Sequence, residues 1–295
     1  MDILQVAKRA NVSTATVSRV LNDFPGVREK TVARVRRAIA ELNYVPNPNA
    51  RSLRVGRTRL FGLIVSDINN PFFPELIDAF EALAAAEGIE VLFTHTGYDP
   101  KRLHSCIRRM IERSVDAIAV MTSEVEEESL QQALRAHIPV VLMNQRKLAD
   151  RYPNVSVEYA TGFREALGHL LSLGHRDIGF IAGPQSFNSA RGRKNAFKAA
   201  CKSHGVSVRD KWIAVGDMRV EGGRMAMEKL LTSSPRPTAV LAANDLMAVG
   251  ALQAAHDAQV RVPGDVSIIG FDDLPIASMV HPPLSTIHHP RRRLA

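Results

Sequence analysis

The sequence predicts an α/β protein with a small all-helical unit at its N-terminus and a larger unit of alternating strands and helices behind it. The first observation is charge. Residues 1–58 contain eleven Lys and Arg but four acidic residues, which gives +7 of the chain's +8. The second is an alternation of apolar runs and helical patterns from residue 59 onward. Concentrated positive charge is typical of a phosphate-binding module, and the alternation is typical of parallel sheets covered by helices.

The helical unit shows the spacing of a helix-turn-helix. Apolar residues recur at helical intervals in three segments, 3–10, 14–21 and 29–42. Ala7, Asn11 and Val17 supply the small residue, the turn residue and the buried aliphatic residue of such a motif. Asn11 tolerates the left-handed conformation that the turn needs, and Ser13 is a good N-cap for the second helix.

The larger unit divides into two series of predicted strands. Strand-like runs fall at 60–65, 90–93, 117–121 and 139–143, and again at 177–182, 238–242 and 266–270. Helical patterns such as 75–86, 101–113, 129–136, 161–173 and 246–255 lie between them. Two series predict two lobes, 59–158 and 159–286. A ligand is expected between them, at the carboxyl ends of the strands.

Several classes of protein are disfavoured. The sequence has no apolar run of about 18 residues and no N-terminal signal region, which predicts a cytoplasmic protein without membrane contact. Cys106 and Cys201 are expected to be reduced and buried. Phosphate-loop, nucleophile-elbow and zinc-protease motifs are missing, so neither an enzyme nor a cofactor is predicted. His281, His288 and His289 lack acidic or Cys partners at ligand spacing, so no metal is predicted.

Ordered motifs along the chain resemble those of the LacI-type bacterial transcription regulators. The recognition element is Val12-Ser13-Thr14-Ala15-Thr16-Val17-Ser18-Arg19-Val20-Leu21-Asn22. The later motifs are Tyr44-Val45-Pro46-Asn47, Ala50-Arg51-Ser52-Leu53-Arg54, Asn69-Asn70-Pro71-Phe72-Phe73, Gly174-His175-Arg176-Asp177-Ile178, Pro237-Thr238-Ala239-Val240, Asn244-Asp245 and Val266-Ser267-Ile268-Ile269-Gly270-Phe271-Asp272-Asp273. The similarity runs from about residue 2 to 290. The sensor half looks closest to the purine-repressor and ribose-repressor branches.

The resemblance implies a periplasmic-binding-protein-like sensor and a five-part organisation. The parts are a helix-turn-helix domain at 1–46, a hinge helix or linker at 47–58, the two sensor lobes, and at 287–295 the start of a crossover and helix. Relatives continue beyond that point. We therefore expect a truncated sensor that dimerises poorly, loses most of its effector response and is cut readily by protease after about residue 58. Three departures concern helix ends. Asn11 and Asn43 stand where the family usually has Gly, and Arg28 replaces the usual Ser cap.

The resemblance also implies which residues contact DNA. Thr14, Ala15 and Arg19 match the base-reading positions, since Arg can bind guanine in the major groove and Ala can contact a thymine methyl. Ser13, Thr16, Asn22 and Tyr44 match phosphate-contacting positions. Ala50, Arg51, Leu53 and Arg54 match a hinge helix that folds on DNA and inserts Leu53 into the minor groove; a disordered basic tether is the alternative.

The effector site is implied in the same way. Phe72 and Phe73 match an aromatic wall, although plain core packing is the alternative. The polar candidates in the second lobe are Asn188, Ser189, Arg191, Arg193, Asn244 and Asp272, and Asp67 in the first lobe is a weaker one. A salt bridge between lobes is the alternative role for Asp272. Met218 stands where several sugar sensors of the family have an aromatic platform, which disfavours a stacked pyranose.

These observations predict a homodimeric transcription repressor that binds a pseudo-palindromic DNA operator. Its DNA affinity is expected to depend on a sugar, a sugar acid or a similar metabolite bound between the lobes. A purine-type system, in which the ligand acts as corepressor, is the alternative within the class. The alternative outside it is a small-molecule binding protein without a regulatory role, which the basic N-terminal unit disfavours. An enzyme is the other competing class.

Overall fold

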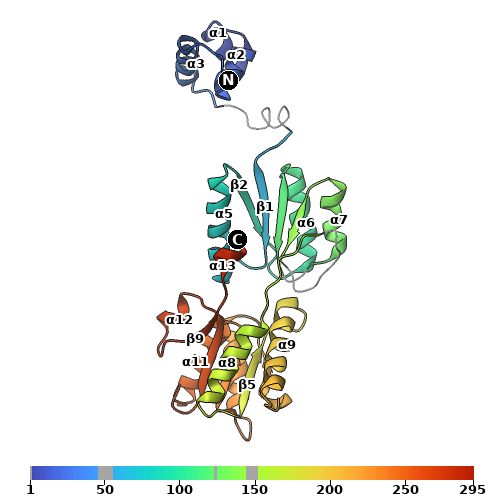
Figure 1. Cartoon of the computed structure of the whole chain (residues 1–295), viewed down its shortest axis with the longest axis vertical. Coiled ribbons are helices and arrows are strands. Elements are labelled where there is room, and N and C mark those ends of the chain that lie inside the picture. Colours follow the sequence, from blue (N-terminus) through green and yellow to red (C-terminus); the bar gives the residue numbers. More distant parts are fainter. Residues whose placement is uncertain (1, 46–55, 123–124, 144–151) are drawn as a thin grey trace. The chain divides into compact units, whose positions relative to one another are not determined.

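The computed structural model describes residues 2–45, 56–122, 125–143 and 152–295. The chain divides into two compact units, Met1–Thr58 and Arg59–Ala295 (Figure 1). Each is described by itself.

The first unit is a three-helix module made of α1 (Ile3–Arg9), α2 (Thr14–Leu21) and α3 (Glu29–Glu41). Its core is small and aliphatic, with Val6, Val17 and Val35 fully buried at its centre. Asn11 and Asn43 adopt φ of 48° and 46°, as expected of turn residues that replace glycine. The side chain of Ser13 caps α2, whereas Arg28 provides no side-chain cap for α3 within the described part of the module.

The second unit contains two parallel sheets. The strands of the first are β1 (Leu60–Val65), β2 (Glu90–His95), β3 (Ala117–Met121) and β4 (Val140–Leu142), in the order β2-β1-β3-β4. Its helices are α5 (Phe72–Ala86), α6 (Pro100–Glu112) and α7 (Glu127–Arg135). Helix α5 covers one face of this sheet, and α6 and α7 cover the other (Figure 1).

Alternation along β1 explains these two layers. Leu63 and Val65 are packed in one buried cluster with Leu76 of α5. Ile64 belongs to a second cluster, with residues of α6 and α7 such as Leu103. Because successive strand residues point to opposite faces, a fully apolar strand requires a helix layer on each side.

The second sheet carries the rest of the chain. Its strands are β5 (Ile178–Ala182), β6 (Ile213–Val215), β7 (Ala239–Ala242), β8 (Ser267–Asp272) and β9 (Ser285–His288), in the order β6-β5-β7-β8-β9. Its helices are α8 (Ala160–Ser172), α9 (Asn188–Ser203), α10 (Val220–Leu231), α11 (Asp245–Asp257) and the short α12 (Ile276–Met279). The described strands of both sheets pair in parallel. The sequence prediction did not include β6 and β9.

Helices α10 and α11 lie in backbone contact. A Cβ atom added at Gly250 of α11 would overlap the carbonyl oxygen of Val220 and lie 2.6 Å from the backbone nitrogen of Arg224. A Cβ at Gly223 of α10 would overlap the backbone of Met247. Glycine on both helices therefore sets the distance between them.

The chain crosses from the second lobe to the first after β9. Strand β9 runs to His288, two residues beyond the expected end of the second lobe, because it pairs with β8 up to Asp272. The short helix α13 (Arg291–Leu294) then lies against α5 (Figure 1). Within the described chain, no helix has the length and apolar character needed to span a bilayer. Cys106 and Cys201 are free and buried, as expected.

Candidate DNA-binding surface and effector cavity

Helix α2 presents the expected recognition residues on its exposed side. Ala15 and Arg19 are both exposed, and their four-residue spacing places them on one helix face. Ser13 accepts a hydrogen bond from the backbone N–H of Thr16 at 3.2 Å, so these two residues fix the start of the helix. Thr14 is half-buried at the first helical position. The exposed face can therefore present Arg19 to a DNA groove.

The structure describes only some of the other residues that are expected to contact DNA. The Asn22 amide donates to the carbonyl of Ser18 at 2.6 Å and so ends α2. Tyr44 packs against the three-helix core with part of its ring exposed. Four hinge residues lie outside the described residues: Ala50, Arg51, Leu53 and Arg54.

A cavity of about 60 Å³ lies between the two lobes. The first lobe contributes Ser66, Asn70, Phe72, Phe73, Tyr98, Met121, Thr122 and Met143, and the second contributes Val157, Tyr159, Ser189, Arg193, Met218, Asp272 and His289. Ser66 and Thr122 directly follow β1 and β3, and Asp272 ends β8. The carboxyl ends of both sheets thus form the cavity, as the rule for open parallel sheets predicts.

Arg193 and Asp272 form a buried ion pair on the second-lobe wall. The Nη2 atom of Arg193 lies 2.8 Å from Oδ1 of Asp272, and the two side chains are 6% and 2% exposed. Arg193 also donates to the carbonyl of Ala243, and its guanidinium lies 4.2 Å from the ring centroid of Phe271. Both partners belong to the second lobe, so Asp272 does not form the lobe-crossing salt bridge considered for it. A buried charge pair with several hydrogen bonds is held in one geometry.

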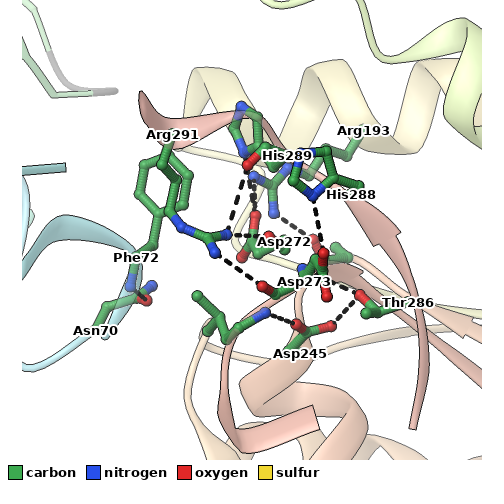
Figure 2. A network of polar contacts seen from close by, with 12 residues as sticks. Asn70, Phe72, Arg193, Asp245, Asp272, Asp273, Thr286, His288, His289 and Arg291 are labelled. Carbon is green, nitrogen blue, oxygen red and sulfur yellow. Dashed lines mark hydrogen bonds and ion pairs between the residues drawn. The ribbon is translucent and has the colours of Figure 1, made fainter. Parts of the chain in front are cut away.

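His289 completes this wall from the segment between β9 and α13. Its Nδ1 lies 3.3 Å from Oδ1 of Asp272, and its ring stacks on Phe72 at 4.8 Å between centroids (Figure 2). Burial lowers the pKa of His289, and the charges of Arg193 and Arg291 act in the same direction. Among the described residues, its Nε2 and the Nε of Arg193 are buried without a hydrogen-bond partner. Such atoms indicate a place for ligand or water.

Asp245 connects the segment after β8 to β9 through hydrogen bonds. Its carboxylate accepts from the backbone N–H of Leu274 at 2.7 Å and from the hydroxyl of Thr286 (Figure 2). Burial raises the pKa of Asp245 to about 6. The contacts of this residue support the strand ends and do not reach the cavity lining.

The structure brings together five of the eight expected effector residues: Phe72, Phe73, Ser189, Arg193 and Asp272. The lining of the described cavity does not include Asn188, Arg191 or Asn244. Arg191 is exposed and donates to the loop before its own helix and to Asn188. Asn244 is fully buried and caps α11 through the backbone N–H of Met247.

Several described contacts connect the lobes around the cavity. Asp67, the weaker candidate, accepts from Asn69 in its own loop and pairs with Arg219 of the second lobe at 3.2 Å. Tyr98 stacks on Phe187 at 4.6 Å between ring centroids. A further contact is made by Arg291 of α13, which pairs with Glu75 of α5 and donates to the backbone carbonyls of Asp272 and Asp273 in the second lobe. Because these contacts join opposite lobes, a change in lobe separation would break them.

Several lining residues were missed by the sequence analysis. They include Ser66, Tyr98, Thr122 and Tyr159, and His289, which was considered as a metal ligand alone. Position was the available signal, because Ser66, Thr122, Met143 and His289 each follow the end of a strand. The described residues contain no cluster of His, Cys, Asp and Glu that could hold a metal ion.

Known proteins match this chain over nearly its whole length. A family model described as bacterial regulatory proteins, lacI family, matches residues 2–47, and a periplasmic-binding-protein-like domain model matches residues 167–295. The HTH-type transcriptional repressor PurR of Pectobacterium carotovorum subsp. carotovorum is 38% identical over 294 residues, which are 99% of this chain and 86% of the relative. The PurR repressor of Proteus mirabilis is 38% identical with the same coverage.

Solved structures agree with this assignment. A crystal structure of the Lac repressor dimer bound to operator and the anti-inducer ONPF matches with a TM-score of 0.88 at 28% identity, covering 100% of this chain and 89% of that chain. A LacI family transcriptional regulator from Enterococcus faecium with bound ribose matches with a TM-score of 0.71 at 26% identity, covering 80% and 85%. The sequence matches, the helix-turn-helix and the two-lobed sensor therefore lead to one conclusion: the chain belongs to the lacI family of bacterial regulatory proteins, as an effector-controlled DNA-binding transcriptional repressor and not an enzyme.

Proposed function

We propose that the effector of this repressor binds in the cavity between the lobes and that its binding sets the affinity for operator DNA. The observation that carries the proposal is the composition of the cavity wall. Phe72 and Phe73 approach from the first lobe, and the buried pair of Arg193 and Asp272 approaches from the second. A ligand that touches both walls binds one lobe arrangement better than another, and this difference is the source of coupling.

The lobe-crossing contacts define the arrangement that a ligand has to favour or oppose. Arg219 with Asp67 and Tyr98 with Phe187 join the lobes in this arrangement. Arg219 is 62% exposed, so its ion pair contributes little energy and is easily broken. The equilibrium between lobe arrangements is therefore open to a small ligand that contacts both sides.

We infer that DNA is bound by two helix-turn-helix modules of a homodimer at a pseudo-palindromic operator. Arg19 and Ala15 read base edges, with Thr14 beside them, and Ser13, Thr16, Asn22 and Tyr44 contact phosphates. Ala50, Arg51, Leu53 and Arg54 act as the hinge in the minor groove. Such a protein works where the bacterial chromosome lies, in the cytoplasm.

The direction of the effector response separates two candidates. In the first, a sugar or related metabolite acts as an inducer and releases the operator. The PurR names of the sequence relatives favour the purine-type alternative, in which the ligand strengthens operator binding. Titration of labelled operator with the chain, in the presence of sugars and nucleobases, tests both. Unchanged operator affinity across the panel would contradict an effector role for the cavity.

Replacement of Arg19 by Ala is expected to relax base preference at one position of each half-site. The loss of a bidentate contact to guanine should cost about 1–3 kcal/mol of operator binding. Competition binding with operators varied at each base measures the effect. Arg28→Ala, which removes another exposed cation, serves as the control for a sequence-independent loss. If Arg19→Ala weakens all sequences equally, Arg19 contacts a phosphate.

Replacement of Leu53 by Ala is expected to reduce operator bending and operator affinity while sparing non-specific binding. The reason is that a wedge side chain stabilises bent DNA, whereas non-specific binding depends on phosphate charge. A gel-shift bending assay on the mutant measures the bend. Unchanged bending would show that residues 47–58 act as a tether.

A further inference from the structure

We propose that His289 determines which effectors the cavity accepts, because its Nε2 atom takes a hydrogen bond from an N–H or O–H group of the ligand. This inference rests on the proposed function of the cavity and adds a requirement for the ligand, which is a hydrogen-bond donor facing the second-lobe wall. His289 lines the cavity, is 3% exposed and sits on the segment that joins the second lobe to α13.

The hydrogen bond to Asp272 determines the tautomer of His289. An ionised carboxylate accepts hydrogen bonds and donates none, and Arg193 lies beside Asp272 as its counter-charge. The Nδ1 atom of His289, 3.3 Å from Oδ1 of Asp272, must therefore carry the proton. In the neutral imidazole, Nε2 is then left with a lone pair and acts as an acceptor.

Burial, together with two neighbouring cations, keeps the His289 ring neutral. Asp272 favours the protonated form, whereas burial and the cations Arg193 and Arg291 oppose it. On the first lobe, Phe72 covers one face of the ring. The acidic groups of α5 that line the outer groove shared with His289 are Glu75 and Asp78, and Glu75 is paired with Arg291. The pKa of His289 lies below its ordinary value as a result, so the acceptor form prevails at neutral pH.

The unpartnered Nε2 atom sets a requirement for the ligand. A buried acceptor without a partner is unfavourable, and a ligand that brings a donor to it removes this penalty. A ligand that brings an acceptor or a methyl group leaves it in place. The stack on Phe72 fixes the ring plane, which makes the requirement directional. Ring N–H groups of nucleobases and hydroxyl groups of sugars share the necessary chemistry.

The test compares three variants of the full chain by calorimetry. The probes are adenine, guanine, hypoxanthine, D-ribose and D-glucose, each with analogues in which one donor is methylated or removed. His289→Phe keeps a ring on Phe72 and removes the acceptor, so it should weaken the binding probe roughly tenfold or more. His289→Gln retains an acceptor and should bind better than His289→Phe. The control His288→Asn alters the exposed neighbour, which pairs with Asp273, and should bind as the wild type does.

The pH profile of the wild type is an independent measurement that needs no variant to fold. Affinity should stay level down through the ordinary histidine value of 6.5 and fall only at more acidic pH, because the pKa of His289 is lowered and its protonation turns Nε2 from acceptor into donor. His289→Gln should lose this fall. Equal binding of a probe by wild type and His289→Phe, or an affinity that rises in acid, would overturn the inference and leave the proposed function standing. If every probe fails to bind the wild-type chain, the proposed function falls and the inference falls with it.

Discussion

Replacement of Arg193 by Ala is expected to abolish effector binding and to lower the free energy of unfolding of the sensor by about 3–5 kcal/mol. The change leaves Asp272, 2% exposed, as a buried carboxylate without its cation. It also removes the guanidinium that lies over Phe271 and donates to the carbonyl of Ala243. Urea unfolding measures the first effect, and calorimetry with an identified effector measures the second.

Two comparisons make the Arg193 result specific. Lys198→Ala removes an exposed cation from the same helix, α9, and should change neither property. Binding to non-specific DNA should persist in Arg193→Ala, because the helix-turn-helix is a separate compact unit. Because Arg193 lowers the pKa of His289, its loss should also raise that pKa. Effector binding at wild-type affinity in Arg193→Ala would place the ligand elsewhere.

Replacement of Gly250 by Ala is expected to destabilise the second lobe by about 3 kcal/mol or more, at the upper end of the cost of overpacking. The added Cβ meets backbone atoms of Val220 and Arg224, which yield less readily than the end of a flexible side chain. Helices α10 and α11 would have to separate, and Asn244 at the start of α11 would lose its bond to the carbonyl of Met218 at the cavity. The midpoint of urea unfolding measures the change.

Gly168→Ala is the matched control for that experiment. Gly168 also lies within a helix, α8, but a Cβ there would meet the ring of His204 at an ordinary 3.6 Å. Alanine should therefore stabilise the chain by about 0.5–1 kcal/mol through helix propensity and a less flexible unfolded state. Equal and small effects at the two positions would mean that α10 and α11 are not held at glycine contact distance.

Periodicity and apolar runs in the sequence predicted most of the fold. The long buried strands β1, β3 and β5 are continuous apolar runs, and their neighbours lie within a few residues of the predicted ranges. The two strands that were missed have physical reasons. Strand β6 is three residues long, and β9 reads Ser-Thr-Ile-His with exposed ends, so neither offers a run of buried apolar residues. These two segments are extended because they form hydrogen bonds with a neighbouring strand, β6 with β5 and β9 with β8.

For the effector cavity, the sequence predicted several of the residues but not how they are arranged. The family resemblance supplied Arg193 and Asp272, and the structure places them in one ion pair. Two other candidates belong to local structure instead: Asn244 caps a helix, and Arg191 binds its own loop. For His289, metal binding alone was considered from the sequence and was disfavoured, because no acidic or Cys partner stood at ligand spacing. In the structure, one ring nitrogen of His289 bonds to Asp272 and the other has no partner. This arrangement depends on contacts between β8, α9 and the segment after β9, which residue spacing in the sequence does not reveal.

The return of α13 to α5 has a consequence for the order in which the protein can be completed during synthesis. The ribosome delivers residues 2–45 first, and their three helices form a core of their own, so the DNA-binding module can fold while the sensor is still being made. The first lobe receives Leu294 against the cluster around Phe72 only after the whole second lobe has been translated. A nascent chain can therefore hold DNA-binding helices well before its two lobes meet. Effector control of this early-folding module therefore has to wait until both lobes of the sensor have been made.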